Sequence, residues 1–269
     1  MARRDDTAPD GRFEGRTAIV TGSTGGIGEA TAKRLAREGA NVVVTGLERD
    51  AGQQVATGIR SEGGEAVFVA ADLGELDGVR TVVETASDTF GEIHAVVNNA
   101  AVQSDASVAD ATLSHWEEAV RVNLRAYWLV VREALEHIPR DARIINVSSN
   151  HAYYTMPGEF PYNVLKSGVE GMTRAMAVDL APLGIRANAV TPGWVLTERT
   201  RSALSEEDRA RLERIHPVGR LGRPADIAGT ISWLLSEDAE FVNGSSILVD
   251  GGRGAVMQDD VFAAHNENR

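Results

Sequence analysis

The chain has 269 residues, 43% of them hydrophobic and 25% charged, so it can bury a sizeable core. Its formal net charge of −12 argues against nucleic acid as a partner, because phosphate binding requires a basic surface. It has no cysteine, which excludes disulfides, thiolate metal ligands and cysteine nucleophiles, and we expect no metal site.

The chain begins with a polar stretch that contains two arginines and no apolar region behind them. This pattern is not a secretory signal, and we expect residues 1–13 to be a disordered lead-in. No apolar run approaches about 18 residues, so we expect no membrane span. With the absence of cysteine, these features fit a cytoplasmic protein.

The first motif runs from Arg16 to Gly28: a short β-branched strand, a glycine-rich turn and the start of a helix. Strand, glycine-rich turn and helix in this order form a phosphate-binding context. We expect Gly22 to permit the tight turn, Gly26 to let the backbone approach a pyrophosphate, and Gly28 to let the helix pack closely. A strand–helix turn without a ligand is the alternative.

Strands and helices alternate along the rest of the chain. The further expected strands are 41–45, 66–70, 94–97, 143–148, 185–190 and 246–249. The further expected helices are 50–62, 76–90, 114–137, 161–180, 206–215 and 224–235. This alternation predicts an α/β fold with a single Rossmann-type, doubly wound parallel sheet and helices on both faces. One domain then spans 14–252, and a polar tail, 253–269, follows.

Two asparagine motifs precede the centre of the chain. Asn98 and Asn99 end the fourth strand, where their amides either brace a cofactor loop or stabilise a turn. In the helix 114–137, Ser114 is the expected N-cap, and Glu117 completes a capping box. Asn123 lies inside that helix, where asparagine is unfavourable, so its amide either bonds locally or has a specific role.

The stretch from 144 to 168 carries the clearest chemistry. An apolar run ends in Ser148 and Ser149, and Tyr162 and Lys166 follow four residues apart on one helix face. A phenol with a pKa of about 10 exchanges protons poorly at neutral pH, and an ammonium beside it lowers that pKa. Ser149 could hold a substrate oxygen. Taken alone, Tyr-x-x-x-Lys also occurs on solvated helix faces.

An apolar stripe and a polar segment follow this stretch, and each predicts a feature of the structure. An apolar stripe of Val169, Met172, Met176 and Leu180 is expected to be core or a subunit contact. Residues 194–217 form a polar excursion between a strand and the next helix, with one short helical stretch at 206–215. Such an excursion is a candidate lid.

Together these motifs resemble the short-chain dehydrogenase/reductase family over about residues 14–252. The matching residues are Thr21-Gly22-x-x-x-Gly26-Ile27-Gly28, Asp72, Asn98-Asn99-Ala100, Asn123, Ser149, Tyr162-x-x-x-Lys166, Pro192-Gly193 and Thr197. Ser149 precedes Tyr162 by 162 − 149 = 13 residues, as is usual in that family, which favours it over Ser148. Ala101 departs from the family, where glycine is usual, and so does the stretch 163–165.

The resemblance implies a nicotinamide cofactor and hydride exchange with a carbinol carbon. Tyr162 would be the acid/base, and Lys166 would lower its pKa and hold the nicotinamide ribose. Ser149 would orient the substrate oxygen, and Asn123 would position water for a proton relay to Lys166.

The same resemblance implies a set of cofactor contacts, in which Asp72 meets the adenine, Asn99 the adjacent ribose and Thr197 the carboxamide. The expected cofactor-binding residues are Gly22, Ser23, Thr24, Gly26, Ile27, Gly28, Gly46, Leu47, Asp72, Leu73, Asn99, Ala100, Tyr162, Lys166, Pro192, Gly193, Val195 and Thr197.

The choice between NAD and NADP rests on the end of the second strand. Family members that prefer NAD often carry an acidic residue at the position of Gly46. Members that prefer NADP usually carry a basic residue at the position of Leu47 or Gly25. Glu48 could reach a ribose and Arg49 a phosphate. Burying a phosphate without a cation is costly, whereas a ribose hydroxyl can stay hydrated, so NAD is favoured.

The leading interpretation is an NAD(P)-dependent oxidoreductase for a small-molecule secondary alcohol or ketone: a sugar, polyol or steroid-like hydroxyl. A 3-oxoacyl thioester (acyl-carrier) reductase is the alternative, although only scattered arginines in 199–223 offer a basic patch. A non-catalytic dinucleotide sensor is an alternative of another class. The resemblance also implies a homotetramer, formed through the helix from Ser114 and the helix after Tyr162.

Overall fold

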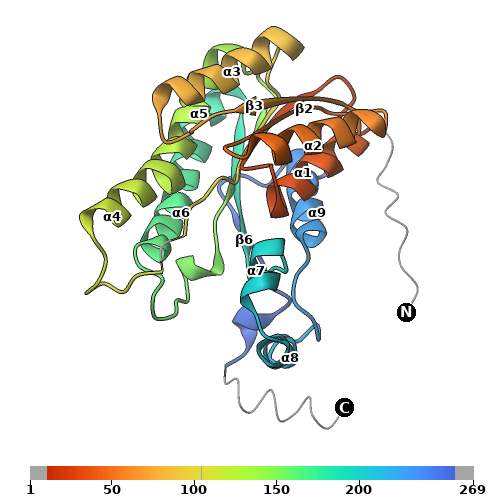
Figure 1. The fold of residues 1–269 in the computed structure, drawn as a ribbon. Coiled ribbons are helices and arrows are strands. Elements are labelled where there is room, and N and C mark those ends of the chain that lie inside the picture. The colour runs from red at the N-terminus through yellow and green to blue at the C-terminus, as the bar shows by residue number, and fades with distance from the viewer. Residues whose placement is uncertain (1–10, 104, 258–269) are drawn as a thin grey trace.

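A computed structural model describes residues 11–103 and 105–257. Within them, seven parallel strands form one sheet in the order β3-β2-β1-β4-β5-β6-β7 (Figure 1). The strands are β1 (Thr17–Thr21), β2 (Asn41–Gly46), β3 (Glu65–Ala70), β4 (Ala95–Asn98), β5 (Arg143–Val147), β6 (Arg186–Pro192) and β7 (Ser246–Val249). The predicted doubly wound parallel sheet is confirmed.

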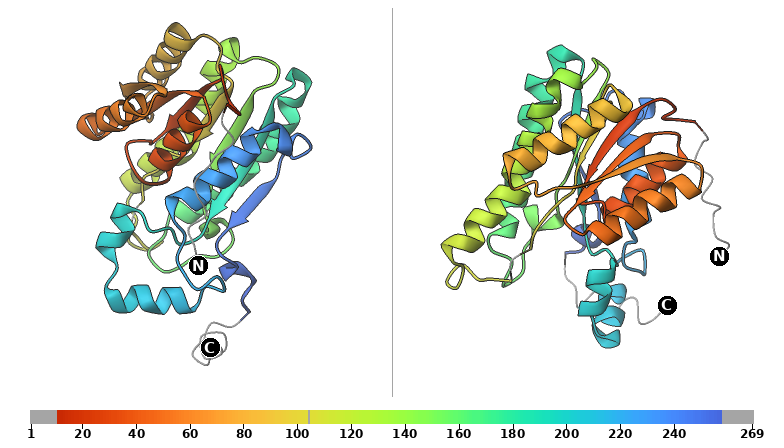
Figure 2. Two further views of the ribbon diagram at one scale, coloured as in Figure 1. Left: turned by 90° about the vertical axis from the view of Figure 1, so that its right-hand side faces the viewer. Right: turned by 45° about the horizontal axis from the view of Figure 1, so that its top comes forward.

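Helices cover both faces of this sheet, and Figure 2 shows the two layers from further directions. The helices are α1 (Gly26–Arg37), α2 (Arg49–Ser61), α3 (Leu76–Phe90), α4 (Leu113–Val120), α5 (Ala126–Ala134), α6 (Tyr162–Asp179), α7 (Glu198–Ala203), α8 (Glu206–Arg214) and α9 (Pro224–Leu235). Helices α1, α2 and α9 pack on one face, and α3, α5 and α6 on the other.

The central strands are buried on both faces, which is why they read as continuous β-branched runs rather than alternating patterns. All of β1 is buried, and Val42, Val43 and Val44 of β2 are fully buried. The apolar stripe on α6 belongs to the same interior, since Val169 and Met176 are buried. Its other members, Met172 and Leu180, pack against the core. Of the two readings of the stripe, core packing is therefore correct.

The predicted helix 114–137 is helical along its whole length, but it is not one regular α-helix. It consists of α4, a π-helical turn at Arg121–Arg125, α5 and a short 3-10 turn. The N-cap is Thr112 instead of Ser114, because the Thr112 hydroxyl accepts from the His115 N–H at 3.2 Å. The His115 ring in turn accepts from the Thr112 N–H, so histidine replaces Glu117 in the capping box.

The segment 194–217 contains two helices instead of the one expected. The additional helix, α7, begins after Thr197, whose hydroxyl accepts from the Thr200 N–H. At the start of the chain, Phe13 is buried in the core, although it was assigned to the lead-in. Residues 1–10 of that lead-in and 258–269 of the expected tail lie outside the described residues. In the described part, no helix is long and apolar enough to cross a membrane.

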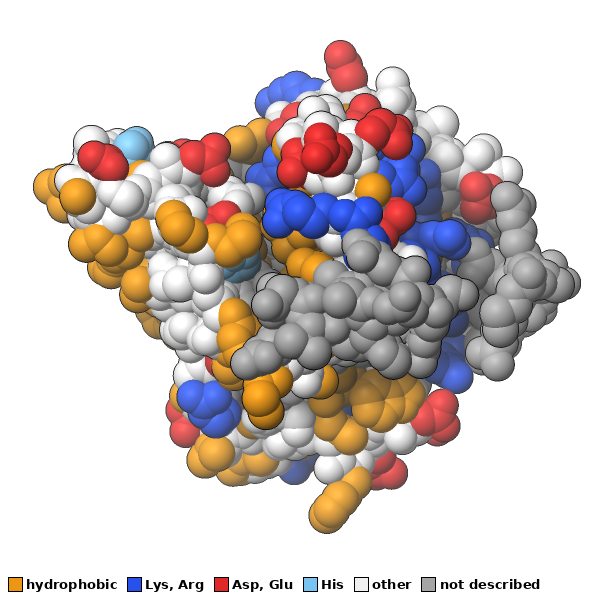
Figure 3. Space-filling view, turned by 90° about the horizontal axis from the view of Figure 1, so that it is seen from below, with side chains coloured by type: hydrophobic (Ala, Val, Ile, Leu, Met, Phe, Trp, Pro, Cys, Tyr) orange, Lys and Arg blue, Asp and Glu red, His pale blue; other side chains and the backbone are white. Residues whose placement is uncertain are grey.

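The surface mixes both signs of charge with exposed apolar side chains. Seen from below, acidic and basic side chains lie near one another, and hydrophobic ones gather on the side where α4 lies (Figure 3). Leu113 of α4 and Val164 of α6 are exposed, and Trp116 stacks on Phe160 with ring centroids 5.8 Å apart. Helices α4 and α6 therefore present apolar surface to their surroundings.

Candidate active site

A cavity of about 980 Å³ lies along the carboxyl ends of the strands. Its wall includes Gly22 after β1, Gly46 at the end of β2, Asn99 after β4, Ser149 after β5 and Pro192 at the end of β6. The strand order reverses between β1 and β4, where crossovers on opposite faces diverge and leave a crevice. The fold thus brings residues far apart in sequence into one wall, with a volume that suits a cofactor or small ligand.

The glycine-rich turn forms one end of this wall. Gly22 and Gly26 have φ values of +59° and +58°, a conformation that side chains with a Cβ rarely adopt. A Cβ on Gly28 would lie 2.2 Å from the Gly22 carbonyl oxygen, so glycine there allows α1 to pack against the turn. Among the described residues, no side chain caps the α1 N-terminus, and its N–H groups can receive an anion.

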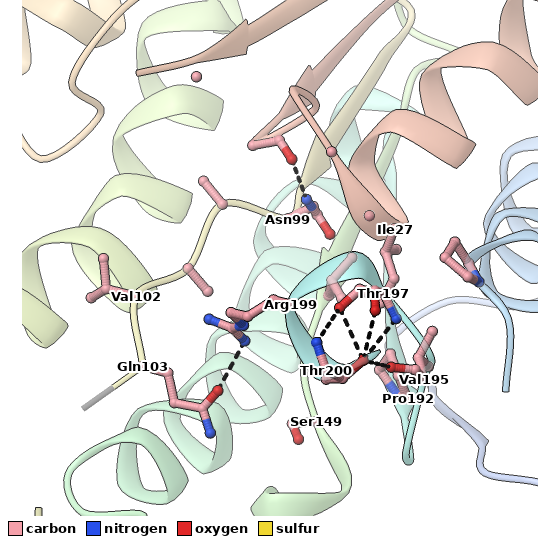
Figure 4. A pocket seen from close by; sticks show the side chains of 18 of the residues that line it. Ile27, Asn99, Val102, Gln103, Ser149, Pro192, Val195, Thr197, Arg199 and Thr200 are labelled. Carbon is pink, nitrogen blue, oxygen red and sulfur yellow. Dashed lines mark hydrogen bonds between the residues drawn. The ribbon is translucent and has the colours of Figure 1, made fainter. Parts of the chain in front are cut away.

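Asn99 holds the turn in place from the neighbouring strand. Its Nδ2 donates to the Thr21 carbonyl oxygen at 2.9 Å and to the Gly22 carbonyl oxygen at 3.0 Å, and Figure 4 shows the second of these bonds. Of the two readings of this amide, bracing the loop is therefore correct. Asn98 has a different task, since its buried Nδ2 donates to Asn146 Oδ1 and to the Tyr127 carbonyl oxygen. These two bonds join β4 to β5 and α5.

Next to this turn, the wall contains Thr24, Gly46, Glu48 and Asp72. Thr24 Oγ1 donates to Glu48 Oε2 at 2.8 Å, and that carboxylate oxygen lies 3.5 Å from where a Gly46 Cβ would be. The same Cβ would lie only 2.6 Å from Thr24 Cγ2, so a larger residue at 46 would require Thr24 to move. Asp72 Oδ1 accepts from the Gly74 N–H and fixes the turn after β3.

Tyr162 and Lys166 lie one helical turn apart at the start of α6 and face the cavity together. Lys166 Nζ lies 5.5 Å from the centre of the Tyr162 ring. It donates to the Val147 carbonyl oxygen at 2.7 Å and to the Tyr127 hydroxyl at 3.2 Å. The side chain of Lys166 is fully buried, and its amine is held between β5, α5 and α6.

Burial disfavours the charged forms of both groups. It lowers the pKa of Lys166 to about 7. Burial also raises the pKa of Tyr162 above its ordinary value, against the influence of the Ser149 hydroxyl; the Glu159 charge raises it further, and the Arg199 charge lowers it. Desolvation is thus the largest influence on the Tyr162 pKa in this arrangement, and a lowering of that pKa by Lys166 stays a prediction.

Ser149 and Ser148 have separate tasks, as the sequence spacing suggested. The Ser148 hydroxyl donates to the Lys166 carbonyl oxygen at 3.1 Å and ties β5 to α6. Ser149 lines the cavity beside Tyr162, and its hydroxyl accepts from the His151 N–H at 3.2 Å. A hydroxyl so placed can donate to a substrate oxygen near the phenol.

Asn123 occupies the π-helical turn between α4 and α5. Its Oδ1 accepts from the Val102 N–H at 2.8 Å, and its Nδ2 donates to the Val102 carbonyl oxygen at 2.7 Å. This pair of bonds reaches 21 residues along the chain and fixes the segment after β4. Such turns often mark functional positions in helices.

The cavity wall contains most of the expected site residues: Gly22, Thr24, Gly26, Ile27, Gly46, Leu47, Asp72, Leu73, Asn99, Ala100, Ser149, Tyr162, Lys166, Pro192, Gly193, Val195 and Thr197. Gly28, Asn123 and Ser23 lie behind it. The Ser23 hydroxyl is buried, donates to the Val20 carbonyl oxygen and accepts from the Thr45 N–H, so it joins β1 to β2. Ala101 lines the cavity without strain, because no described residue other than glycine has a positive φ.

Several site residues escaped the sequence analysis. Tyr127 holds the Lys166 amine, and Gln103, Glu159 and Arg199 line the cavity beyond Ser149. His151 packs edge-on against Tyr162, with ring centroids 5.9 Å apart. The one sequence signal was the position of Tyr127, four residues after Asn123 on the same predicted helix.

The site fits a nicotinamide dinucleotide. An uncapped helix N-terminus with a glycine turn can take the pyrophosphate, and Glu48 and Asp72 offer acceptors near one end. Pro192, Val195 and Thr197 lie at the other end, beside Ser149, Tyr162 and Lys166. The cavity therefore has a place for a dinucleotide and, next to it, for a small substrate.

Comparisons with known proteins agree with this site. A family model described as enoyl-(acyl carrier protein) reductase matches residues 22–253. Glucose 1-dehydrogenase 2 of Bacillus subtilis is 35% identical over 88% of this chain and 94% of its own length. The 3-oxoacyl-[acyl-carrier-protein] reductase of Thermotoga maritima is 32% identical over 90% of this chain and 98% of its own.

Solved structures of related proteins have the same fold. A short-chain dehydrogenase/reductase from Brucella melitensis, described as glucose/ribitol dehydrogenase, superposes with a TM-score of 0.86 at 32% identity, covering 91% of this chain and 98% of its own. With the sheet order, the glycine turn and the Ser149, Tyr162 and Lys166 arrangement, these matches show that the chain belongs to the short-chain dehydrogenase/reductase family of oxidoreductases.

Proposed function

We propose that this protein is an NAD-dependent dehydrogenase or reductase that interconverts a secondary alcohol and its ketone. The observation that carries the proposal is the placement of Ser149, Tyr162 and Lys166 in one wall of a cavity that ends at an uncapped helix N-terminus. A bound dinucleotide would supply or accept the hydride. The protein's own groups would bind the substrate oxygen and move its proton.

Tyr162 is the proton donor and acceptor in this proposal. Because burial raises its pKa, the phenol is protonated at neutral pH and can donate to the oxygen of a ketone. Ser149 donates a hydrogen bond to the same oxygen and orients it. Lys166 holds the ribose of the nicotinamide half, and Asn123 keeps the segment after β4 in register for a water relay.

A panel assay with matched binding measurements tests the proposal. Secondary alcohols with NAD, and ketones with NADH, are followed by the absorbance of the reduced nicotinamide. We expect turnover with at least one pair. Dinucleotide binding without turnover across the panel would favour a sensor instead. A clear preference for a 3-oxoacyl thioester would favour an acyl-carrier reductase. This is the second candidate function because the Thermotoga maritima relative is such a reductase.

NAD is the proposed cofactor because of Glu48. Its carboxylate stands beside Gly46, where acidic residues accept hydrogen bonds from ribose hydroxyls and repel a 2′-phosphate, and Thr24 fixes it there. Arg49 is not part of the described cavity wall, and Lys33, which is, pairs with Glu29 at 2.6 Å. Of Glu48 and Arg49, only Glu48 lines the cavity, and this supports NAD.

Glu48→Gln tests this assignment. We expect the wild type to have a higher kcat/KM with NAD than with NADP, and the variant to lose at least about tenfold of that preference. Asp50→Asn is the matched control, since Asp50 lies in the first turn of the same helix, outside the cavity wall. A tenfold preference for NADP in the wild type would show that a basic residue such as Arg37 dominates.

A homotetramer is the proposed assembly, formed through α4, α5 and α6. The exposed apolar side chains of Leu113, Trp128 and Val164 support it, because a contact between copies would remove them from water. The α6 stripe no longer contributes, since it packs inside the subunit.

A further inference from the structure

Three polar side chains line the cavity beyond Ser149, and they bond to one another. Gln103 Nε2 donates to Glu159 Oε1 at 3.2 Å and to Oε2 at 3.0 Å. Arg199 Nη2 donates to Gln103 Oε1 at 2.9 Å (Figure 4). Gln103 follows β4, Glu159 precedes α6 and Arg199 belongs to α7, so three separate segments meet here.

This Gln103–Glu159–Arg199 set lies at the substrate end of the cavity. Glu159 lies three residues before Tyr162, just ahead of α6, and is only 9% exposed. The charges of Glu159 and Arg199 both act on the Tyr162 pKa, in opposite directions. Both charged groups line the same cavity as Ser149 and Tyr162, so a substrate whose oxygen is bound there can meet them.

We propose that the Gln103–Glu159–Arg199 set recognises an uncharged substrate that carries a second hydroxyl next to the carbinol that reacts, as in a polyol or sugar. This inference rests on the proposed alcohol–ketone chemistry and narrows its substrate. The acidic and basic members balance, so a substrate anion would meet Glu159 and a substrate cation would meet Arg199, and neither is favoured.

Gln103 donates to one charged group and accepts from another, which a substrate hydroxyl could also do. Its amide donates to the carboxylate and accepts from the guanidinium, as a hydroxyl can do with its hydrogen and its oxygen. A substrate hydroxyl can therefore replace or join the amide without leaving either charge unpaired. A wholly apolar alcohol offers nothing to the buried Glu159 carboxylate, and bonds to charged groups are among the stronger ones.

The roles within the set differ. Glu159 and Arg199 would contact the hydroxyl, whereas Gln103 positions them. Loss of a contact made in both the ground and transition states raises KM more than it lowers kcat. We therefore expect the effects of changes in this set to appear mainly in KM, unlike those of changes at Tyr162.

Two matched substrate pairs test the inference: 2,3-butanediol against 2-butanol, and cis-1,2-cyclohexanediol against cyclohexanol. With NAD and the full-length protein, we expect kcat/KM at least about tenfold higher for each diol. Equal or lower values for both diols, with clear turnover of the simple alcohols, would overturn the inference and leave the proposed function standing. No turnover of any alcohol or ketone would overturn both.

Variants test whether the Gln103–Glu159–Arg199 set causes the preference for a diol over the simple alcohol. Glu159→Gln and Arg199→Leu should each reduce the diol-to-alcohol ratio about tenfold, mainly through the KM of the diol. Arg201→Leu is the control, since Arg201 is an exposed residue of the same helix, outside the cavity wall. The diol should also raise the melting temperature of the wild type more than that of Glu159→Gln. An unchanged ratio in both set variants would overturn the assignment.

Discussion

Lys166→Met should stabilise the protein at neutral pH while it abolishes turnover. The chain contains only two lysines, Lys33 and Lys166, and the second is fully buried beside Tyr127. Burial lowers the pKa of Lys166 from 10.5 to about 7, so the folded state holds this proton less tightly than the unfolded chain does. The wild-type protein therefore gains stability as the pH rises from 7 to 10.5. Below pH 7 its stability is lowered by the full free energy of burying a protonated lysine.

The expected change in the free energy of unfolding follows from the difference between the folded and unfolded pKa values of Lys166 and from the two hydrogen bonds that the substitution removes. A change from 10.5 to about 7 corresponds to about 5 kcal/mol at low pH, since one pKa unit is about 1.4 kcal/mol. Methionine removes the bonds to the Val147 carbonyl and the Tyr127 hydroxyl, worth about 1 kcal/mol each. Tyr127 still donates to Val147, so that carbonyl keeps a partner. The variant should be more stable by about 3 kcal/mol at pH 6 and about equal to wild type at pH 9.

Urea unfolding of both proteins between pH 6 and pH 9 measures this trend, because contributions from other groups cancel in the difference. Lysine labelled at Cε gives two NMR signals, and the Lys166 signal should titrate near pH 7. Lys33→Met, at the surface of α1, is the control for loss of the other lysine and identifies its NMR signal. A pH-independent difference for Lys166→Met, or titration of Lys166 near 10, would refute the reasoning.

Three further predictions concern the site and the assembly. Because burial raises the Tyr162 pKa, kcat/KM for alcohol oxidation should rise with pH from 7 to 10, whereas kcat/KM for ketone reduction should stay level because the phenol remains protonated; initial rates test this, and flat oxidation rates would contradict it. Residues 194–217 should set the substrate, so exchanging them for those of a relative should alter relative kcat/KM values, and an unchanged preference would count against a lid. Light scattering at micromolar concentration should give the mass of a tetramer, and a monomer would rule out the proposed assembly.

The fold was predictable because each strand and helix of a βα repeat has its own local pattern. The carboxyl ends of parallel strands share one edge, so Gly22, Asn99 and Ser149 had to meet once the alternation was recognised. Tyr162 and Lys166 were found for the same local reason, a spacing of one helical turn.

The errors concern features whose local signal is ambiguous or weak, or that depend on contacts distant in sequence. Thr112 and Ser114 are both good N-caps, and only the structure shows which hydroxyl reaches a helical N–H. The π-helical turn coincides with the Asn123 bonds to Val102, 21 residues away. Helix α7 has six residues, too few for a periodic pattern, and it is held by its Thr197 cap and by Arg199.

The electrostatics of the site were beyond sequence for a related reason. A lysine near a tyrosine suggests a lowered phenol pKa, but burial acts on both groups, and its extent is known only from the packed structure. Likewise Glu48 becomes the acidic group beside Gly46 only because Thr24 holds it there. Sequence spacing could place both residues near the ribose without choosing between Glu48 and Arg49.

The proton-transfer role of Tyr162 is tested most directly by Tyr162→Phe, measured by kcat with an active alcohol and by dinucleotide titration. The substitution removes the phenol oxygen and little else, so kcat should fall at least about a hundredfold while the dinucleotide Kd stays within about twofold. Tyr154→Phe, at an exposed tyrosine whose hydroxyl donates to the Gly254 carbonyl, should retain full activity. Retention of more than about a tenth of the wild-type kcat by Tyr162→Phe would contradict the account.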